Sequence, residues 1–201
     1  MSDVYLVTEH VEVSLRTLLA TRPVTPSEAE LLMHDLLSGA HAMHSAELVH
    51  RDLRPANLLI KFAFNQVCVL QIGDMSSVVS QSSTRPSMLS TSGQRNYRAP
   101  ETLASQTSTA ASDLWAIGTI MAETLSSKML FSGVSDKEVF VNIIRLLGTP
   151  SEQMLKDELC AGPPVRTSVG ILKYFVFIDS LVFFGRHQIT LSLLLACYYF
   201  F

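Results

Sequence analysis

The stretch from residue 50 to residue 57 combines side chains that could act on a phosphate group. It holds one acid, Asp52, the amide Asn57 and two arginines, and a proline between them restricts the backbone. A second acid, Asp74, follows further along the chain. Carboxylate and amide oxygens are suitable ligands for divalent cations, which phosphate chemistry requires. If the fold brings these residues together, the sequence predicts a cation-assisted phosphate site.

A capped helix and a small hairpin are the elements expected to position these residues. Thr25, Pro26 and Glu28 have the types and spacing of a capping box with proline in the first turn, so a helix is predicted from there to about Ser45. Two apolar runs, at 57–60 and 67–72, suit the two strands of a hairpin. That hairpin would place Asp74 directly after its second strand.

Other segments complete the expected secondary structure. Residues 4–8 are typical of a short strand, and helical spacing of apolar residues returns between 114 and 125. Ser135 and Glu138 predict another capped helix, which should end at Gly148. Ten of the 17 residues from 76 to 92 are Ser or Thr, which predicts a solvated loop; whether it is also a phosphorylated switch stays open.

The composition limits the classes of protein to which the chain can belong. Its 201 residues carry 15 Lys and Arg against 18 Asp and Glu, a net charge of −3, which argues against broad nucleic-acid binding. Hydrophobic residues at 48% and charged residues at 16% exclude disorder for most of the chain. Three widely spaced cysteines predict neither a disulfide framework nor a zinc site, and favour an intracellular protein. The first ten residues lack the features of a signal peptide.

The last 33 residues differ in composition from the rest. They hold 9 of the 16 aromatic residues, but charged residues divide them, and their longest stretch without Asp, Glu, Lys or Arg is 15 residues. A membrane-spanning helix needs about 20 predominantly apolar residues, so membrane association is disfavoured. A packing role and a sequence unrelated to the preceding fold are the two other interpretations.

Several motifs in a fixed order resemble those of eukaryotic protein kinases. The run HRDLRPANLLI resembles the catalytic loop H-R-D-x-x-x-x-N, Asp74-Met75-Ser76 stands where the family has D-F-G, and Ala99-Pro100-Glu101 resembles A-P-E, in which Glu101 would be structural support. Residues 97–101, 113–118 and 146–151 resemble the mitogen-activated and cyclin-dependent kinases. The resemblance implies an α+β protein-kinase-like fold, with a mainly helical C-terminal lobe, a small β-hairpin and an N-terminal lobe that is essentially absent.

The resemblance also implies roles for the polar residues of the catalytic loop. Asp52 would accept or orient the proton of the substrate hydroxyl, and Asn57 and Asp74 would hold Mg²⁺ against the phosphates of ATP. Arg54 stands where the family usually has a lysine that steadies the transferring phosphoryl group. Arg51 would pair with a phosphate on the activation loop.

The nucleotide pocket would be formed largely by residues of the hinge-like opening segment. By resemblance, Thr8 guards the back of the pocket, the backbones of Glu9 and Val11 bind adenine, and Leu59 lines the floor. Asp113 resembles the buried acid that braces the backbone of the catalytic loop.

The sequence also departs from the family pattern. Ser76 replaces a glycine and lacks its backbone freedom, whereas Met75 is expected still to pack as the family's phenylalanine does. Leu89-Ser90-Thr91 stands in place of the T-x-Y pair, and Gln94 replaces a threonine. No G-x-G-x-x-G occurs, and only about three residues precede the hinge-like strand. We therefore expect residues 1–160 to be a partial kinase domain and residues 161–201 a divergent, aromatic-rich tail.

By this resemblance, the function is ATP-dependent phosphorylation of serine or threonine in proteins, with ATP and Mg²⁺ as cofactors, although the chain by itself is expected to be inactive. The expected partners are a protein substrate and an upstream kinase; nucleic acid is excluded and membrane association is disfavoured. The expected location is the cytoplasm, with the nucleus as a second compartment. The alternatives are a non-catalytic interaction module derived from a kinase and a membrane-associated regulatory fragment.

Overall fold

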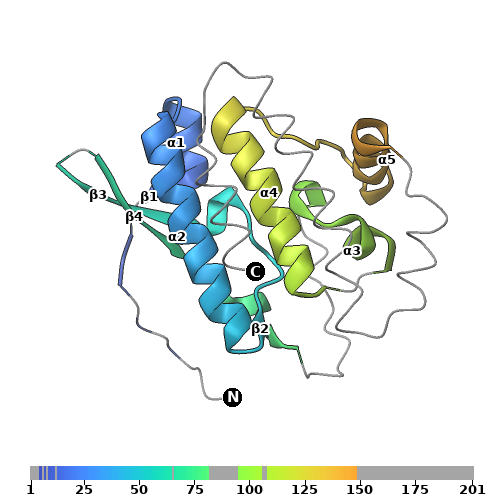
Figure 1. The fold of residues 1–201 in the computed structure, drawn as a ribbon, viewed down its shortest axis with the longest axis horizontal. Coiled ribbons are helices and arrows are strands. Elements are labelled where there is room, and N and C mark those ends of the chain that lie inside the picture. Colours follow the sequence, from blue (N-terminus) through green and yellow to red (C-terminus); the bar gives the residue numbers. More distant parts are fainter. Residues whose placement is uncertain are drawn as a thin grey trace.

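Two long helices form the centre of the protein in a computed structural model, with a β-hairpin at one end and two shorter helices at the other (Figure 1). The structure describes residues 5, 7, 9–11, 13–64, 66–81, 95–105 and 108–148. The helices are α1 (Leu15–Thr21), α2 (Pro26–Ser45), α3 (Pro100–Ser105), α4 (Ala110–Ser126) and α5 (Asp136–Leu147). The strands are β1 (Val13–Ser14), β2 (Leu48–Val49), β3 (Leu58–Ala63), β4 (Gln66–Ile72) and β5 (Val79–Ser80), and the short 3₁₀ turns are η1 (Pro55–Asn57), η2 (Met75–Ser77) and η3 (Arg95–Tyr97).

Helix α2 begins as the sequence predicts. The Thr25 hydroxyl accepts a hydrogen bond from the backbone N–H of Glu28 at 3.3 Å, and the Glu28 carboxylate accepts one from the N–H of Thr25 at 3.0 Å. The two terminal guanidinium nitrogens of Arg22, Nη1 and Nη2, donate to the same carboxylate at 2.9 and 2.6 Å. The capping box is therefore confirmed, and Arg22 reinforces it. The helix then buries one face, which includes Leu32, Met33, Leu36, Leu37 and Ala40.

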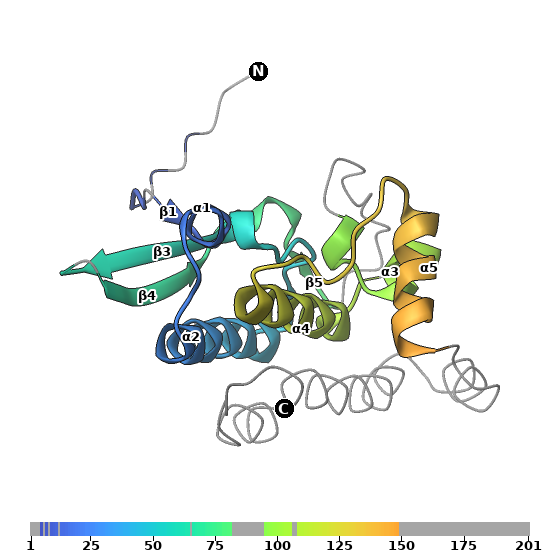
Figure 2. The same cartoon turned by 90° about the horizontal axis from the view of Figure 1, so that it is seen from above.

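The hairpin is also confirmed, with strands longer than predicted. Strands β3 and β4 pair antiparallel from Leu58↔Ile72 to Ala63↔Gln66, and β1 adds a short third strand beside β3. The prediction that Asn57 belongs to the first strand is wrong: Pro55 starts a 3₁₀ turn that ends at Asn57, and the ladder begins one residue later. Figure 2 shows the hairpin extending from one end of the helical layer.

The hairpin packs tightly against helix α2. A Cβ atom on Gly39 of α2 would lie only 2.9 Å from Cδ1 of Ile72, so glycine allows the helix and β4 to approach closely. The carboxylate of Asp35, also on α2, accepts a hydrogen bond from the backbone N–H of Leu70 at 3.0 Å. Because this N–H belongs to an edge strand, the bond both anchors the hairpin and satisfies an edge donor.

Three local features differ from the sequence-based expectations. Tyr5 and Val7 are the described residues of the strand expected at 4–8, and both are exposed and lie outside any strand. The strand that pairs with β3 is β1 instead, which starts at Val13. Helix α1 was not predicted, although the Ser14 hydroxyl caps it by accepting from the N–H of Thr17 at 3.2 Å. The expected solvated loop at 76–92 instead begins with η2 and β5, because β5 finds a partner in β2; residues 82–92 lie outside the described part.

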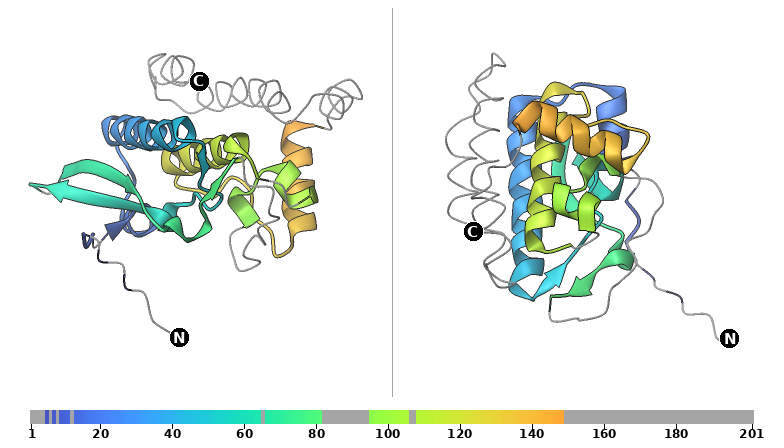
Figure 3. Two further views of the ribbon diagram at one scale, coloured as in Figure 1. Left: turned by 90° about the horizontal axis from the view of Figure 1, so that it is seen from below. Right: turned by 90° about the vertical axis from the view of Figure 1, so that its right-hand side faces the viewer.

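The later helices follow the predicted caps. The Ser135 hydroxyl accepts from the N–H of Glu138 at 3.2 Å, and Gly148 ends α5 with a positive φ of 83°. Helix α4 packs beside α2, and the β2–β5 pair lies near the end of α2 (Figure 3). Within the described residues, no helix has both the length and the apolar character needed to cross a membrane. The aromatic-rich end and the positions Ser90, Thr91 and Gln94 lie outside the described residues.

Candidate active site

The carboxylate of Asp113 holds the backbone at the start of the loop that bears Asp52. Asp113 is only 2% exposed and accepts hydrogen bonds from the backbone N–H groups of His50 and Arg51, both at 2.8 Å. The imidazole of His44, at the end of α2, contacts the same carboxylate at 2.9 Å. Arg51 has a positive φ of 71°, an uncommon conformation for a residue with a side chain. The two backbone bonds therefore hold a backbone geometry that the loop alone would not favour.

His50 connects this loop to the end of the hairpin. Its side chain is buried, its Nδ1 accepts a hydrogen bond from the backbone N–H of Asp52 at 3.3 Å, and its Nε2 lies 3.0 Å from the carbonyl oxygen of Gly73. A carbonyl oxygen only accepts hydrogen bonds, so Nε2 carries the proton and Nδ1 is the acceptor. The imidazole thus fixes the spacing between the loop and the residue before Asp74.

Asp52 has one oxygen engaged by its neighbours. Its Oδ2 accepts hydrogen bonds from Nδ2 of Asn57 at 3.0 Å and from Nε of Arg54 at 3.1 Å. The amide of Asn57 also donates to the backbone carbonyl of Asp52 at 2.9 Å, which closes the loop. The carboxylate is therefore fixed through Oδ2, and Oδ1 is the oxygen that can accept a proton from an incoming hydroxyl group.

Asp74 lies two residues after the end of β4, beyond Gly73, and is exposed. Its φ is 56°, and its Oδ1 accepts hydrogen bonds from the hydroxyl of Ser76 at 2.6 Å and from the N–H of Ser76 at 3.4 Å. The bond from the Ser76 hydroxyl is the main cause that lowers the pKa of Asp74, so the carboxylate is charged at neutral pH. The positive φ belongs to Asp74 and not to Ser76, so the loss of glycine at position 76 costs no backbone strain here.

The expected packing of Met75 is wrong for the described structure, since its side chain is 51% exposed. The residue lies in the 3₁₀ turn η2, and neither core cluster of the described residues includes it. Asp74 is consequently held by its local turn and by the hairpin, rather than by burial of the next residue.

The oxygen atoms of Asn57 and Asp74 fit a magnesium site that is completed by a ligand. The N–H of Gly73 donates to the carbonyl of Asn57 at 2.8 Å, which holds the two segments together. Because Nδ2 of Asn57 is committed to Asp52, its Oδ1 is the atom that can serve as a ligand, together with Oδ2 of Asp74. Mg²⁺ is usually bound by one or two carboxylates plus water and phosphate oxygens, so this donor set suits it.

The structure brings together only some of the residues that the resemblance assigns to nucleotide binding. Leu59 is half-buried, and its Cδ1 would lie 3.1 Å from a Cβ on Gly73, so it sits beside the residue preceding Asp74. Val11 is half-buried, whereas Glu9 is exposed and its side chain forms an ion pair with Lys61 that lowers the pKa of Glu9. Thr8 lies outside the described residues.

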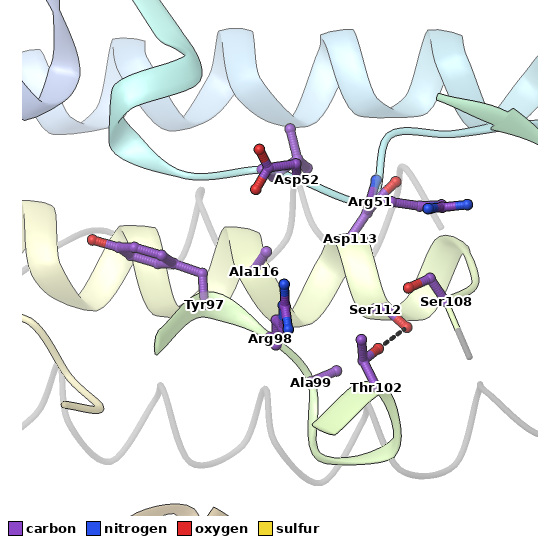
Figure 4. Close-up of a pocket in the computed structure, with 11 residues that line it drawn as sticks. Arg51, Asp52, Tyr97, Arg98, Ala99, Thr102, Ser108, Ser112, Asp113 and Ala116 are labelled. Carbon is purple, nitrogen blue, oxygen red and sulfur yellow. Dashed lines mark hydrogen bonds between the residues drawn. The ribbon is translucent and has the colours of Figure 1, made fainter. Parts of the chain in front are cut away.

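A small pocket lies between the loop at 51–53 and the segment at 97–102 (Figure 4). Arg51 lines it, and burial lowers the pKa of its guanidinium group; among the described residues, its Nε has no hydrogen-bond partner. The floor is tied together by Ser112, whose hydroxyl donates to Glu101 at 2.9 Å and accepts from Thr102 at 3.3 Å. Glu101 thus connects α3 to α4.

Sequence reasoning missed several residues that support this site. Tyr97 donates to the carboxylate of Glu123 at 2.6 Å, and burial, followed by this bond, raises the pKa of the phenol. His44 and Ser112 were also missed as supports, because their partners are 69 and 11 residues away in the sequence. No local pattern marks such pairs.

Comparison with known proteins gives one consistent result. Residues 1–163 match the protein kinase domain family. The mitogen-activated protein kinase HOG1B of Wallemia ichthyophaga is 37% identical over 165 residues, which cover 82% of this chain and 43% of the relative. The mitogen-activated protein kinase hog1 of Aspergillus clavatus is 36% identical over 167 residues, covering 83% and 44%. The chain therefore spans less than half the length of these curated relatives.

Proposed function

The chain belongs to the protein kinase family, and from that premise we propose that residues 50–74 form the large-lobe half of a protein serine/threonine kinase active site. The reaction would transfer the terminal phosphoryl group of ATP to a serine or threonine hydroxyl of a protein. The observation that carries the proposal is the geometry of Asp52: one carboxylate oxygen is fixed by Asn57 and Arg54, and the other is left for the substrate.

In the proposed mechanism, each polar residue has a separate task. Oδ1 of Asp52 orients the attacking hydroxyl group and accepts its proton, while the two bonds to Oδ2 keep the carboxylate in place. The guanidinium group of Arg54 provides positive charge next to Asp52, where charge develops on the transferring group. Its fork-shaped donor set differs from the compact ammonium of lysine, so its fit to a phosphoryl group would differ too.

Asn57 and Asp74 would hold the cation that the family uses with ATP. Bound Mg²⁺ would neutralise charge on the phosphate oxygens as they transfer. Within the chain, the bond between Gly73 and Asn57 and the bond between His50 and Gly73 keep the two ligand residues at a fixed spacing. Leu59 would provide an apolar surface beside them for the nucleotide.

We further propose that the chain does not catalyse phosphoryl transfer by itself, because its 201 residues contain no G-x-G-x-x-G motif to cover the phosphates of ATP. Protein substrates, an upstream kinase and a cytoplasmic or nuclear location follow from the family and are part of the same proposal. So is the division into a kinase part at 1–160 and a tail at 161–201. The exposure of Met75 favours one competing function, a non-catalytic interaction module.

Two assays on matched variants test the proposal. First, Mg-ATP should leave the thermal unfolding midpoint of the 201-residue chain unchanged; a clear rise that Asp74→Ala abolishes would show that the chain binds nucleotide alone. Second, the chain is joined behind the nucleotide-binding lobe of an active mitogen-activated protein kinase, and phosphorylation of serine and threonine peptides is measured.

The chimera should phosphorylate the peptides, and Asp52→Asn should lower its turnover by about 10²–10⁴-fold without weakening nucleotide binding. Asp136→Asn is the matched control, since the Asp136 carboxylate pairs with Arg95 and Arg98 and with no residue of the loop at 50–57 in the described structure. Undiminished turnover in Asp52→Asn would refute the assigned base. A chimera that binds Mg-ATP and phosphorylates nothing would favour the interaction module.

A further inference from the structure

The hydrogen bonds from Ser76 make the two carboxylate oxygens of Asp74 unequal. The Ser76 hydroxyl and backbone N–H both donate to Oδ1, at 2.6 and 3.4 Å, and no such bond is found to Oδ2 among the described residues. Asp74 caps the turn η2 and Ser76 lies within it, two positions further on, so the bond does not depend on a distant element. Wherever Asp74 keeps this turn, its two oxygens have unequal access to a cation.

This asymmetry matters because divalent cations differ in how they use a carboxylate. Mg²⁺ requires near-octahedral geometry at 2.0–2.1 Å and retains several waters, so it is satisfied by one oxygen of each ligand. Ca²⁺ takes about six to eight oxygens and often binds both oxygens of one carboxylate. A hydrogen bond that occupies Oδ1 is therefore compatible with Mg²⁺ on Oδ2, but competes with two-oxygen binding of Ca²⁺.

We propose that Ser76 determines cation specificity at this site by holding Asp74 to one-oxygen coordination, which disfavours Ca²⁺ relative to Mg²⁺. The inference rests on the proposed function, because it takes Asp74 as a cation ligand. Asp74 is exposed, so cations reach it without a change in the described fold. The glycine of the D-F-G pattern has no hydroxyl group and would leave Oδ1 free of the shorter bond.

Four substitutions separate the parts of this inference. Ser76→Ala removes the hydroxyl group, and Ser76→Thr retains it as the conservative rescue. Ser77→Ala is the matched control, since Ser77 is the next residue of the same turn and makes no bond to Asp74 in the described structure. Asp74→Asn removes the carboxylate and tests whether Asp74 is a ligand at all.

The experiment uses the 201-residue chain labelled with ¹⁵N, titrated separately with MgCl₂ and CaCl₂ without nucleotide. Binding is followed through the amide cross-peaks of Gly73 and Met75, which flank Asp74. We expect Ca²⁺ affinity to rise about tenfold in Ser76→Ala, on the scale of one hydrogen bond to a charged group, while Mg²⁺ affinity changes less than about twofold. Ser76→Thr and Ser77→Ala should keep the Ca²⁺ to Mg²⁺ affinity ratio of the unchanged chain.

The outcomes distinguish this inference from the proposed function. If Asp74→Asn abolishes binding but Ser76→Ala leaves the ratio unchanged, Ser76 has no role in specificity, while Asp74 remains a ligand. If Asp74→Asn binds both cations as the unchanged chain does, Asp74 is not the ligand, and the cation site of the proposed function fails with it. If neither cation shifts the two cross-peaks of the unchanged chain, these residues do not bind a cation without nucleotide, and the inference is overturned. A ratio that changes equally in Ser76→Thr would also overturn the role of the hydroxyl group.

Discussion

Replacing Asp113 by asparagine should destabilise the whole fold, although only one atom changes its identity. Asp113 is the buried carboxylate that receives two backbone N–H groups from the loop, at His50 and Arg51, and the imidazole of His44. Asparagine has one oxygen and one NH₂ group, so at least one of these donors would face another donor. The substitution therefore tests whether this carboxylate anchors the loop that bears Asp52.

The magnitude follows from the three bonds. If the asparagine oxygen replaces Oδ2, the hydrogen bonds with His50 and His44 are kept, but their acceptor is then a neutral amide oxygen instead of a carboxylate oxygen. The N–H of Arg51 is left without an acceptor. An unsatisfied buried donor costs about 1–3 kcal/mol, and charge-assisted bonds are roughly twice as strong as neutral ones. We expect a loss of about 3 kcal/mol in the free energy of unfolding, a large share of the roughly 5–15 kcal/mol that is typical of a domain.

Urea unfolding of the 201-residue chain, followed by circular dichroism, measures this loss. Asp136→Asn is the control, because it makes the same chemical change at an exposed ion pair, where the expected loss is below about 1 kcal/mol. The unfolding midpoint should fall for Asp113→Asn with little change in slope. If the two variants lose the same stability, the buried carboxylate does not anchor the loop, and the reasoning from its hydrogen bonds is refuted.

Three further predictions concern pH and packing. The hydrogen bond from Arg22 is the main cause that lowers the pKa of Glu28 from 4.5 to about 2, so the stability that this pair contributes is complete above pH 4.5 and is lost as the pH falls toward 2. In urea unfolding at several pH values, Glu28→Gln should therefore reduce the loss of stability in acid by about 1 kcal/mol. An unchanged dependence of stability on pH would contradict the pair. The pKa of Tyr97 is raised by burial, so Tyr97→Phe should leave the amplitude of the near-ultraviolet absorbance titration around pH 10 unchanged; a drop by one tyrosine would show that Tyr97 ionises normally. The change in the free energy of unfolding caused by Gly39→Ala should be more favourable by about 1 kcal/mol when Ile72 is also changed to valine. Valine lacks the Cδ1 atom that the new methyl group would meet. A double-mutant cycle measures this difference, and equal effects of Gly39→Ala in both backgrounds would argue against the contact.

The sequence is sufficient to predict the elements whose causes are local. The caps at Thr25 and Ser135, the stop at Gly148 and the hairpin each depend on residues a few positions apart, and the structure has all of them. Helix α1 has an equally local cap at Ser14, so it could have been found. The order of motifs from Asp52 to Glu101 is also local information, and it was enough to indicate the kinase family that the comparisons show.

Tertiary structure alone decided how the site residues are held. The bond between His50 and Asp113 joins residues 63 positions apart, and the contact between His50 and Gly73 joins residues 23 apart. β5 forms only because β2 lies beside it, although its own sequence favours a loop. Hydrogen-bond partners of this kind are selected by the packing of α2, α4 and the hairpin, which no short window of sequence contains. The sequence by itself determined which chemical groups the chain has, and the fold determined which oxygen of Asp52 and of Asp74 accepts the hydrogen bonds of its neighbours.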